Sequence, residues 1–477
     1  MTQESRPFPE EQEYPGNAEW IAHDNPHILF AELAKEQGPV VPLLGKRKLV
    51  AINGLETITE VLKDQADKVK RPTSLESVQS GPVIRTLPIK DGPLHKEQRV
   101  IMAKVINDFI MTKIPETEAC IRQATDFIIE EIATGRPVDP DLPVGAGMMF
   151  YVYQANFGVS LTREEAFEAA RKLNTLSFMK NALSGRFQTF REELAPSVGH
   201  EEFIRKFELF KRDRNPLYEV GVKQVAEHQR SFDPNRLRDM TDGLIKANQD
   251  YKRGPAGDNQ LNEEDILAGS LFQLFGASKA TTTMFVIYAL HYMATYPEIQ
   301  AAVQDELDRA MAEGAQPGYF HRDKTPLTHA CMWEILRHSS LTAIATFNYE
   351  TKEEIVAAGQ KLDKGAILFI NYYSTTRDER YWPDPEVFDP KRFLNKDGKI
   401  ERDQLDKFLP FGIGSHKCLG GNWAQLSVLT FFATLVARCR FEKAPSTPDR
   451  LGQHAGVFLI PHNYKLIATR RESVMAD

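Results

Sequence analysis

Cysteine is scarce in this sequence, with four residues in a chain of 477. They lie far apart, and no two have the C-x-x-C spacing of a zinc site. A disulfide framework of the kind found in small secreted proteins is therefore excluded. The scarcity favours a reducing compartment, and we expect a cytoplasmic protein. The four positions are Cys120, Cys331, Cys418 and Cys439.

Long hydrophobic runs are also missing. The N-terminal stretch MTQESRPFPEEQEYPGN is acidic and polar, so it lacks the basic and apolar regions of a signal peptide. The longest charge-free apolar stretch, residues 280–297, contains four threonines and His291. This composition favours a buried central helix over a membrane span. We expect no transmembrane anchor in this chain, and the alternative that an anchor was removed stays open.

An excess of positive charge is absent as well, because the net charge is −7. This balance gives no reason to expect nucleic acid as a partner. The composition, with 42% hydrophobic and 26% charged residues, is that of an ordinary globular protein with enough apolar residues for a large core. Since no repeat and no Gly/Ser-rich linker divides the chain, we expect a single domain over residues 1–477.

Hydrophobic periodicity predicts a mainly α fold with small β-sheets. A short amphipathic helix over residues 28–37 precedes a β-hairpin within residues 38–54, and residues 54–250 are mainly helical in period. Asn262 is the expected N-cap of a long, nearly uncharged helix, and a second helix follows from Pro297. The long helix must lie in the middle of the protein. Short strands, a proline-rich coil, a final helix over residues 419–438 and terminal strands over residues 457–469 complete the chain.

Cys418 lies in the stretch KFLPFGIGSHKCLGG, between glycine-bearing turns and ahead of the predicted final helix. A thiolate in a dry site needs backbone N–H donors, and the first turn of a helix supplies them. Gly412, Gly414 and Gly420 allow the backbone to curl around the sulfur, and an aromatic ring at Phe411 can shield it from water. A lone cysteine is a poor zinc or iron–sulfur ligand but suits axial ligation of haem iron. The alternative is a buried, unreactive cysteine.

The stretch FGIGSHKCLG resembles the haem-binding loop of the cytochrome P450 family, F-G-x-G-x-[HR]-x-C-x-G, at every fixed position. The resemblance covers nearly the whole chain. INGLE, QADKVKRP and FDPNRLRDMTDGLI look most like the animal microsomal branch that includes steroid and xenobiotic hydroxylases. It implies the cytochrome P450 fold, haem b as cofactor and Cys418 as the iron ligand. The expected haem contacts from the loop are Phe411, Gly412, Gly420 and Ala424.

Two upstream segments support the resemblance. EILR resembles the family's E-x-x-R element, and FDPKRF resembles the segment that provides a further arginine. By this match Glu334, Arg337 and Arg392 form a buried structural cluster, in which one carboxylate is held by two guanidinium groups and braces the cysteine loop. Standing alone, E-x-x-R would more often be a solvated helix pair.

The segment DGPLHKEQR resembles the helix that reaches the haem carboxylates in the family. His95 and Arg99 lie four residues apart, so both project from one helical face. With His416 they are the expected ligands of the haem propionates. The sequence departs from the family at Asn348, where a cation is frequent, because asparagine can donate a hydrogen bond but carries no charge.

The long helix reads Ala277-Ser278-Lys279-Ala280-Thr281 where the family has A-G-x-[DE]-T, a pattern that forms the dioxygen groove and carries an acid–alcohol pair. Thr281 keeps the alcohol, Ala280 replaces the acid and Ser278 replaces the groove glycine. These three are the expected catalytic positions, and a proton relay would have to use Thr281, Ser278, water or a substrate group. Thr281 could instead be an ordinary helix threonine bonded back to a carbonyl. Lys279 is expected to point elsewhere.

These departures leave several functions open. The first is a monooxygenase that inserts one oxygen atom of dioxygen into a lipophilic small molecule, with electrons from a reductase or a ferredoxin. The second is a haem-thiolate enzyme that uses peroxide, or that catalyses an isomerisation or dehydration. The third, of another class, is a haem-binding sensor, which has no need for helices over residues 173–214 that cover a substrate pocket.

By the resemblance, the pocket walls are residues 72–88, the long helix near Phe272 and Ala277, residues 341–347, and the turn near Val457 and Phe458. These segments are mostly apolar, which implies a lipophilic or aromatic substrate, although each could also be ordinary core. Basic residues near the cysteine are candidates for docking an acidic electron donor. They are Lys96, Lys407, Lys417, Arg438 and Arg440.

Overall fold

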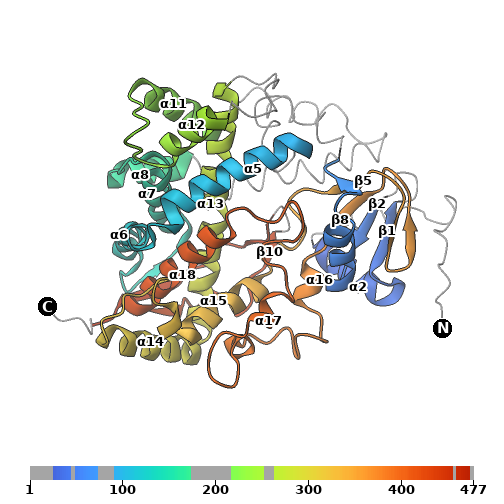
Figure 1. Ribbon diagram of the computed structural model, residues 1–477. Coiled ribbons are helices and arrows are strands. Elements are labelled where there is room, and N and C mark those ends of the chain that lie inside the picture. The colour runs from blue at the N-terminus through green and yellow to red at the C-terminus, as the bar shows by residue number, and fades with distance from the viewer. Residues whose placement is uncertain are drawn as a thin grey trace, which may run out of the picture.

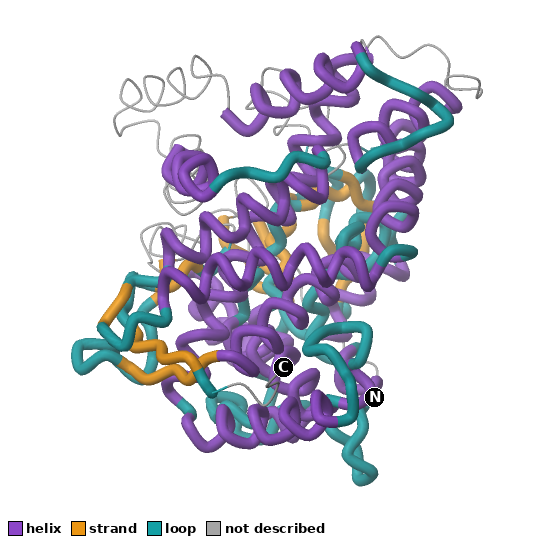
Figure 2. Tube along the Cα trace, turned by 90° about the vertical axis from the view of Figure 1, so that its left-hand side faces the viewer, coloured by secondary structure: helices purple, strands orange, loops and turns teal. Residues whose placement is uncertain are grey.

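Helices make up most of the molecule, and the strands are gathered into small sheets (Figure 1) (Figure 2). The computed structural model describes residues 25–44, 49–72, 91–172, 216–251, 263–454 and 458–472. The helices before the long one are α2 (Pro26–Gln37), α3 (Leu55–Thr59), α5 (Gly92–Ile106), α6 (Ile114–Ile132), α7 (Asp141–Phe157), α8 (Arg163–Lys172), α11 (Pro216–Arg230) and α12 (Met240–Tyr251). The others are α13 (Glu263–Thr295), α14 (Pro297–Ala312), α15 (Pro326–Ser339), α16 (Tyr373–Thr376), α17 (Arg402–Leu405) and α18 (Gly421–Arg438). Short helical turns are η1 (Glu60–Asp64), η4 (Asn107–Met111), η5 (Arg322–Lys324) and η6 (Pro390–Phe393).

The largest sheet has the strand order β1-β2-β8-β5-β3 and lies to one side of the helices, next to α2 and α16 (Figure 1). Its strands are β1 (Val40–Leu44), β2 (Leu49–Ile52), β8 (Ile367–Ile370), β5 (Tyr349–Thr351) and β3 (Val69–Lys70). β1 and β2 are antiparallel, with Val40 opposite Ile52, which confirms the predicted hairpin. β2 and β8 are parallel, so this sheet joins the start of the chain to its C-terminal half.

Three smaller sheets complete the strands of the described residues. One has the order β4-β12-β9, and the others are the pairs β6-β7 and β10-β11. Their strands are β4 (Pro137–Val138), β12 (Leu466–Arg470), β9 (Cys439–Lys443), β6 (Ile355–Ala357), β7 (Gln360–Leu362), β10 (Gln453–His454) and β11 (Ile460–Pro461). This arrangement confirms the prediction of a mainly α fold with small sheets.

The long helix α13 runs through the middle of the helical part and packs against α7, α11, α15 and α18 (Figure 1). Its apolar residues from Met284 to Met293 are buried, which confirms the prediction of a central helix. Pro297 starts α14, since proline is well accommodated at the first position of a helix. Within the described residues, no helix is both long enough and apolar enough to cross a membrane.

Several sequence-based expectations fall outside the described residues. They are the N-cap Asn262, the segments 73–88 and 173–214, Val457, and the side chain of Phe272. The final helix begins at Gly421, two residues later than expected. Leu419 and Gly420 still belong to the loop, and the Ala424 N–H donates to the Gly420 carbonyl oxygen at 2.7 Å to start the helical pattern.

Candidate active site

A cavity of about 560 Å³ lies between α5, α13, the connection from α15 to β5, and the loop before α18. This volume is in the range of small-molecule sites. Cys418 borders the cavity and is the one cysteine of the described residues with an exposed side chain. The loop residues Phe411, Gly412, His416, Gly420 and Ala424 border the same cavity.

The cysteine loop is shaped by two glycines in the left-handed region, with φ values of +69° at Gly412 and +78° at Gly414. A Cβ atom at Gly414 would collide with the carbonyl oxygen of Leu62 in η1, so glycine is needed there for conformation and for space. The Cys418 N–H donates to the Phe411 carbonyl oxygen at 2.8 Å, which closes the loop. The Phe411 ring meets Trp333 of α15 edge-on, with 6.2 Å between ring centroids.

Opposing effects act on the pKa of the Cys418 thiol. The Cys418 side chain is open to the cavity but is otherwise surrounded by protein, and this removal from bulk water raises the pKa of the thiol, while the Gly420 N–H donor to the sulfur and the positive charges of Arg99 and Lys417 act to lower it. Burial prevails, so the pKa lies above its ordinary value and the free thiol keeps its proton. Metal binding would displace that proton, because a coordinating thiol is deprotonated. The N–H donor and the nearby cations would then stabilise the sulfur charge.

A basic cluster forms another part of the cavity wall. The rings of His95 on α5 and His416 on the loop have centroids 4.3 Å apart. His416 Nε2 bonds to an Asp91 carboxylate oxygen at 3.0 Å. Burial, followed by repulsion from His416 and Arg99, lowers the pKa of His95 to about 4, and burial also lowers the pKa of His416. An anionic group bound here would raise both pKa values, because it would favour the charged rings.

Arg71 is a cavity residue that the sequence did not reveal. Its side chain is 8% exposed, and Nη1 donates to the carbonyl oxygens of Phe347 at 2.8 Å and Asn348 at 3.2 Å. Its guanidinium lies over the Tyr349 ring, 4.2 Å from the centroid. Asn348 itself is buried and is not among the described residues that border the cavity. Arg71, held through the Asn348 backbone, therefore places a positive charge at the cavity.

The sequence signal for Arg71 is weak. It stands in QADKVKRP, before a proline that favours extended backbone, and next to other basic residues that look like ordinary surface cations. Its N–H donates to the carboxylate of Asp91 at 2.6 Å, and Asp91 in turn holds His416. Only the folded chain brings these three residues together.

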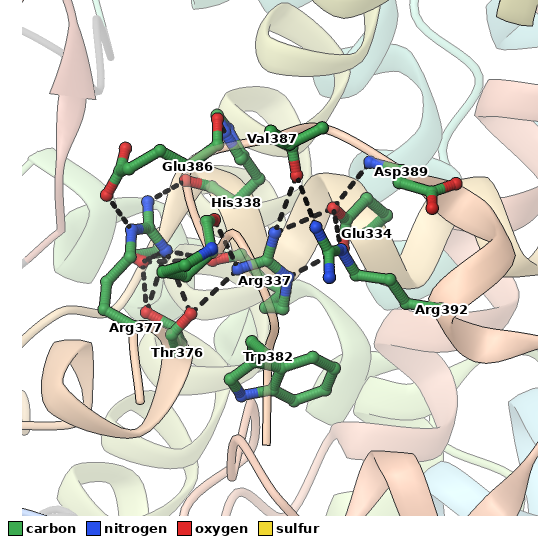
Figure 3. A network of polar contacts seen from close by, with 12 residues as sticks. Glu334, Arg337, His338, Thr376, Arg377, Trp382, Glu386, Val387, Asp389 and Arg392 are labelled. Atoms are coloured by element: carbon green, nitrogen blue, oxygen red, sulfur yellow. Dashed lines mark hydrogen bonds and ion pairs between the residues drawn. The ribbon is translucent and has the colours of Figure 1, made fainter. Parts of the chain in front are cut away.

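Glu334, Arg337 and Arg392 do not border the cavity but form a polar cluster with one another (Figure 3). The Arg337 guanidinium donates to both Glu334 carboxylate oxygens at 2.7 Å, and both side chains are fully buried. Arg392 Nε lies 3.5 Å from the same carboxylate, and the Asp389 N–H donates to it at 2.9 Å.

The cluster also binds backbone carbonyls of the coil between α16 and η6. Arg337 Nη1 donates to the oxygens of Thr376 at 2.8 Å and Pro385 at 2.9 Å, and Arg392 Nη2 donates to Asp384 O at 2.8 Å. The ring of Trp382 lies under the Arg337 guanidinium, 5.3 Å away (Figure 3). Together, α15, η6 and the proline-rich coil are fixed to one another, and α15 backs the cysteine loop through Trp333.

On α13, the expected distal positions Ser278, Ala280 and Thr281 all border the cavity. The Thr281 hydroxyl donates to the Ala277 carbonyl oxygen at 2.8 Å, and the Ser278 hydroxyl donates to the Leu274 carbonyl oxygen at 2.5 Å. Thr281 therefore forms the bond to a helix carbonyl that the sequence offered as the alternative, and it also borders the cavity. Each hydroxyl oxygen keeps its lone pairs for a donor in the cavity.

Lys279, expected to point elsewhere, is also among the residues that border the cavity, and it is 2% exposed. Burial lowers its pKa to about 7, although attraction to Asp141 acts in the opposite direction.

The residues around the cavity fit a haem group. One accessible thiol is present for the iron, and Arg71, His95, Arg99 and His416 are present for two carboxylates. The remaining wall is apolar in large part, with Leu274, Phe285, Leu341, Phe347 and Phe458 among its residues.

Comparisons with known proteins point in the same direction. A family model described as Cytochrome P450 matches residues 7–468. The chain is 28% identical over 452 residues to the polybrominated aromatic compounds synthase of Pseudoalteromonas luteoviolacea (strain 2ta16). This match covers 93% of this chain and 91% of that protein. It is 28% identical over 441 residues to cytochrome P450 1A1 of Oryctolagus cuniculus, and this match covers 89% of this chain and 83% of that protein.

Among solved structures, the chain is similar to a zebra fish cytochrome P450 determined with abiraterone. The TM-score is 0.76 at 21% sequence identity, and the match covers 94% of this chain and 100% of the other. At this identity, the structural likeness concerns the fold.

Proposed function

Because this chain belongs to the cytochrome P450 family of haem-thiolate monooxygenases, we propose that it inserts one oxygen atom of dioxygen into a lipophilic aromatic molecule. The observation that carries this proposal is that Cys418 and Thr281 border the same cavity, with mostly apolar residues around them. The relative from Pseudoalteromonas luteoviolacea, which is named for aromatic compounds, supports an aromatic substrate.

The haem b cofactor supplies the activation of dioxygen when it is bound. In the proposed roles, the Cys418 sulfur holds the iron, and Arg71, His95, Arg99 and His416 hold the haem carboxylates. The Thr281 hydroxyl, already bonded to Ala277 O, accepts a hydrogen bond or passes a proton in the cavity. The apolar wall positions the substrate and excludes water.

An electron-donor protein is the proposed partner, and the basic residues near the cysteine differ in their suitability for it. Lys96 and Lys417 are exposed. Arg438 is paired with Asp126 and Arg440 with Glu442, so part of their charge is already neutralised. Docking through the lysines would give a reduction rate that falls as salt is raised.

A second candidate is a haem-thiolate enzyme that uses peroxide, or that rearranges an oxygenated substrate. The observation in its favour is Ala280, which borders the cavity where the family carries an acid. Turnover of an aromatic probe with NADPH and a reductase, compared with turnover with hydrogen peroxide, tests the two. The first proposal requires reductase-driven product that contains an oxygen atom from labelled dioxygen. Product with peroxide only, or without any oxidant, would overturn it in favour of the second.

Restoring the acid is a direct test of the altered relay. Ala280→Asp should raise reductase-driven turnover and the fraction of electrons that appear in product, by a few-fold or more, because a positioned acid commonly contributes about 10²–10⁴-fold to proton transfer. Ala280→Asn, which has the same shape but no acid, is the matched control and should not produce the gain. Equal turnover in all three proteins would show that the missing acid does not limit the reaction.

A further inference from the structure

The connection between α15 and β5, residues 340–348, is a fixed wall of the cavity. The Ala345 N–H donates to Ile370 O and the Tyr373 N–H donates to Ala343 O, both at 2.9 Å. The Leu459 N–H donates to Leu341 O at 2.9 Å. The segment is therefore tied to β8, to α16 and to the chain before β11, and its side chains have defined positions.

Thr342 and Thr346 are the half-buried hydroxyl residues of this wall, and both border the cavity. Neither hydroxyl forms a hydrogen bond with any described residue, whereas three other hydroxyls at the cavity are bonded within the protein. Ser278 and Thr281 donate to helix carbonyls, and the Ser340 hydroxyl donates to Arg337 O at 3.0 Å. Among the described residues nothing uses the hydrogen-bonding capacity of the two threonines, so it is available to a ligand in the cavity.

The neighbours of these two threonines are apolar. Leu341 is 7% exposed and Ala345 is 6% exposed, and Phe347 borders the cavity beside them. When a purely hydrocarbon ligand covers a hydroxyl, the hydroxyl loses its hydrogen bond to water, and this loss weakens the binding free energy by about 1–3 kcal/mol. A ligand oxygen that bonds to it avoids this cost, so the wall discriminates against the hydrocarbon.

We propose that Thr342 and Thr346 determine specificity by hydrogen-bonding oxygen substituents of the substrate, so that this enzyme takes hydroxylated aromatic molecules in preference to the parent hydrocarbons. The proposal rests on the proposed monooxygenase function and names the substrate class of the same cavity. The two threonines stand four positions apart in this wall, and each offers its own hydroxyl to a substituent of the substrate.

The test measures binding to the haem-loaded protein, with biphenyl, 4-phenylphenol and 4,4′-dihydroxybiphenyl as probes and with titration calorimetry as the readout. The wild-type protein should bind each phenol at least about 10-fold more tightly than biphenyl, which corresponds to about 1.4 kcal/mol. The double variant Thr342→Val/Thr346→Val, which keeps the shape and removes both hydroxyls, should bring the three dissociation constants within about twofold of one another. The single variants show which threonine serves each probe.

Two controls keep the result interpretable. Biphenyl should bind the double variant at least as tightly as the wild type, because the hydroxyls that it leaves unpaired are gone, and this shows that the pocket is intact. Thr342→Ser/Thr346→Ser should retain the preference, since both hydroxyls remain, and Thr112→Val, at an exposed site where the hydroxyl donates to Asp108 O, should leave it unchanged. A preference retained by the double valine variant, or absent from the wild type, would overturn the proposal. Because no turnover is measured, this failure is distinct from a failure of the monooxygenase proposal, which would appear in the reductase assay.

Discussion

Gly414 shows how a single residue shapes the site, because its φ of +78° and its contact with the Leu62 carbonyl both exclude a side chain. An alanine in the left-handed conformation lowers the free energy of unfolding by roughly 1–2 kcal/mol. Gly414→Ala should lower it by clearly more and should also reduce the haem content, because the cysteine loop must move away from η1. Chemical unfolding and the ratio of haem to protein measure the two effects.

Gly398→Ala is the matched control for this change. Gly398 has a φ of +71°, but a Cβ atom there would meet nothing within 4 Å. It should therefore show the conformational cost alone and full haem content. If both variants lost the same stability and kept their haem, the close approach of the loop to η1 would have no part in holding the cofactor.

Arg71 is the second residue whose role follows from its position. Arg71→Met should speed the loss of haem to an acceptor protein by about 10-fold or more, because a hydrogen bond to a charged group contributes about 1.5–3 kcal/mol. Arg380→Met is the control, since Arg380 is exposed and pairs with Asp378 and Glu56. Equal rates of haem loss for wild type and Arg71→Met would contradict the assignment of Arg71 to the cofactor carboxylates.

At the scale of elements, the connection between α11 and α12 depends on a histidine that carries both ring protons. His228 Nδ1 lies 2.8 Å from Gln224 O, and Nε2 lies 2.9 Å from an Asp239 carboxylate oxygen. Both partners are acceptors, so the ring is charged. Burial opposes the charge, but the hydrogen bond and charge of Asp239, the Gln224 carbonyl and the charge of Asp242 together outweigh it, and the pKa of His228 is raised above its ordinary value of 6.5.

The sign of the pH effect follows from that shift. A raised pKa in the folded state stabilises the protein fully below pH 6.5, and the contribution is lost as the pH rises through the folded-state pKa. Hydrogen exchange of α11 and α12 should therefore show stronger protection in wild type than in His228→Gln at acid pH. The difference should shrink as the pH is raised; a constant difference would show that the histidine acts without its charge.

The same group, His228 with Asp239 and Asp242, lies close enough to suggest a metal site, with ligand atoms within 4.8 Å of one another. Its hydrogen bonds point instead to a structural role. Asp239 accepts the N–H groups of Thr241 and Asp242 at the start of α12, and the Arg238 guanidinium donates to both oxygens of Asp242.

The elements differ in how far the sequence could predict them. The central helix was predictable, because its buried stretch is long and uncharged and Pro297 marks the next helix. The final helix was placed two residues early, since Gly420, whose N–H bonds to the Cys418 sulfur, is the N-cap and Leu419 precedes it. Arg71 could not be found, because its partners Asp91, Phe347 and Asn348 lie far away in the sequence.

At the scale of the whole molecule, the motifs predicted the family well. The spacing of the residues around Cys418 and after Glu334 identified the family from the sequence alone, and the family match over residues 7–468 confirms that identification. The animal cytochrome P450 1A1 relative agrees with the expected resemblance to the animal branch. Substrate specificity was less accessible, because it depends on which side chains of several distant segments face one cavity. The expectation of one domain over residues 1–477 stays a prediction.

The central claim is that the Cys418 sulfur binds the haem iron, and the absorption spectrum of the reduced protein with carbon monoxide tests it most directly. The account predicts a Soret band in the red-shifted region typical of sulfur ligation for the wild type, and loss of that band in Cys418→Ser with the fold retained. A folded, haem-loaded wild-type protein without the red-shifted band, or a serine variant that keeps it, would contradict the account.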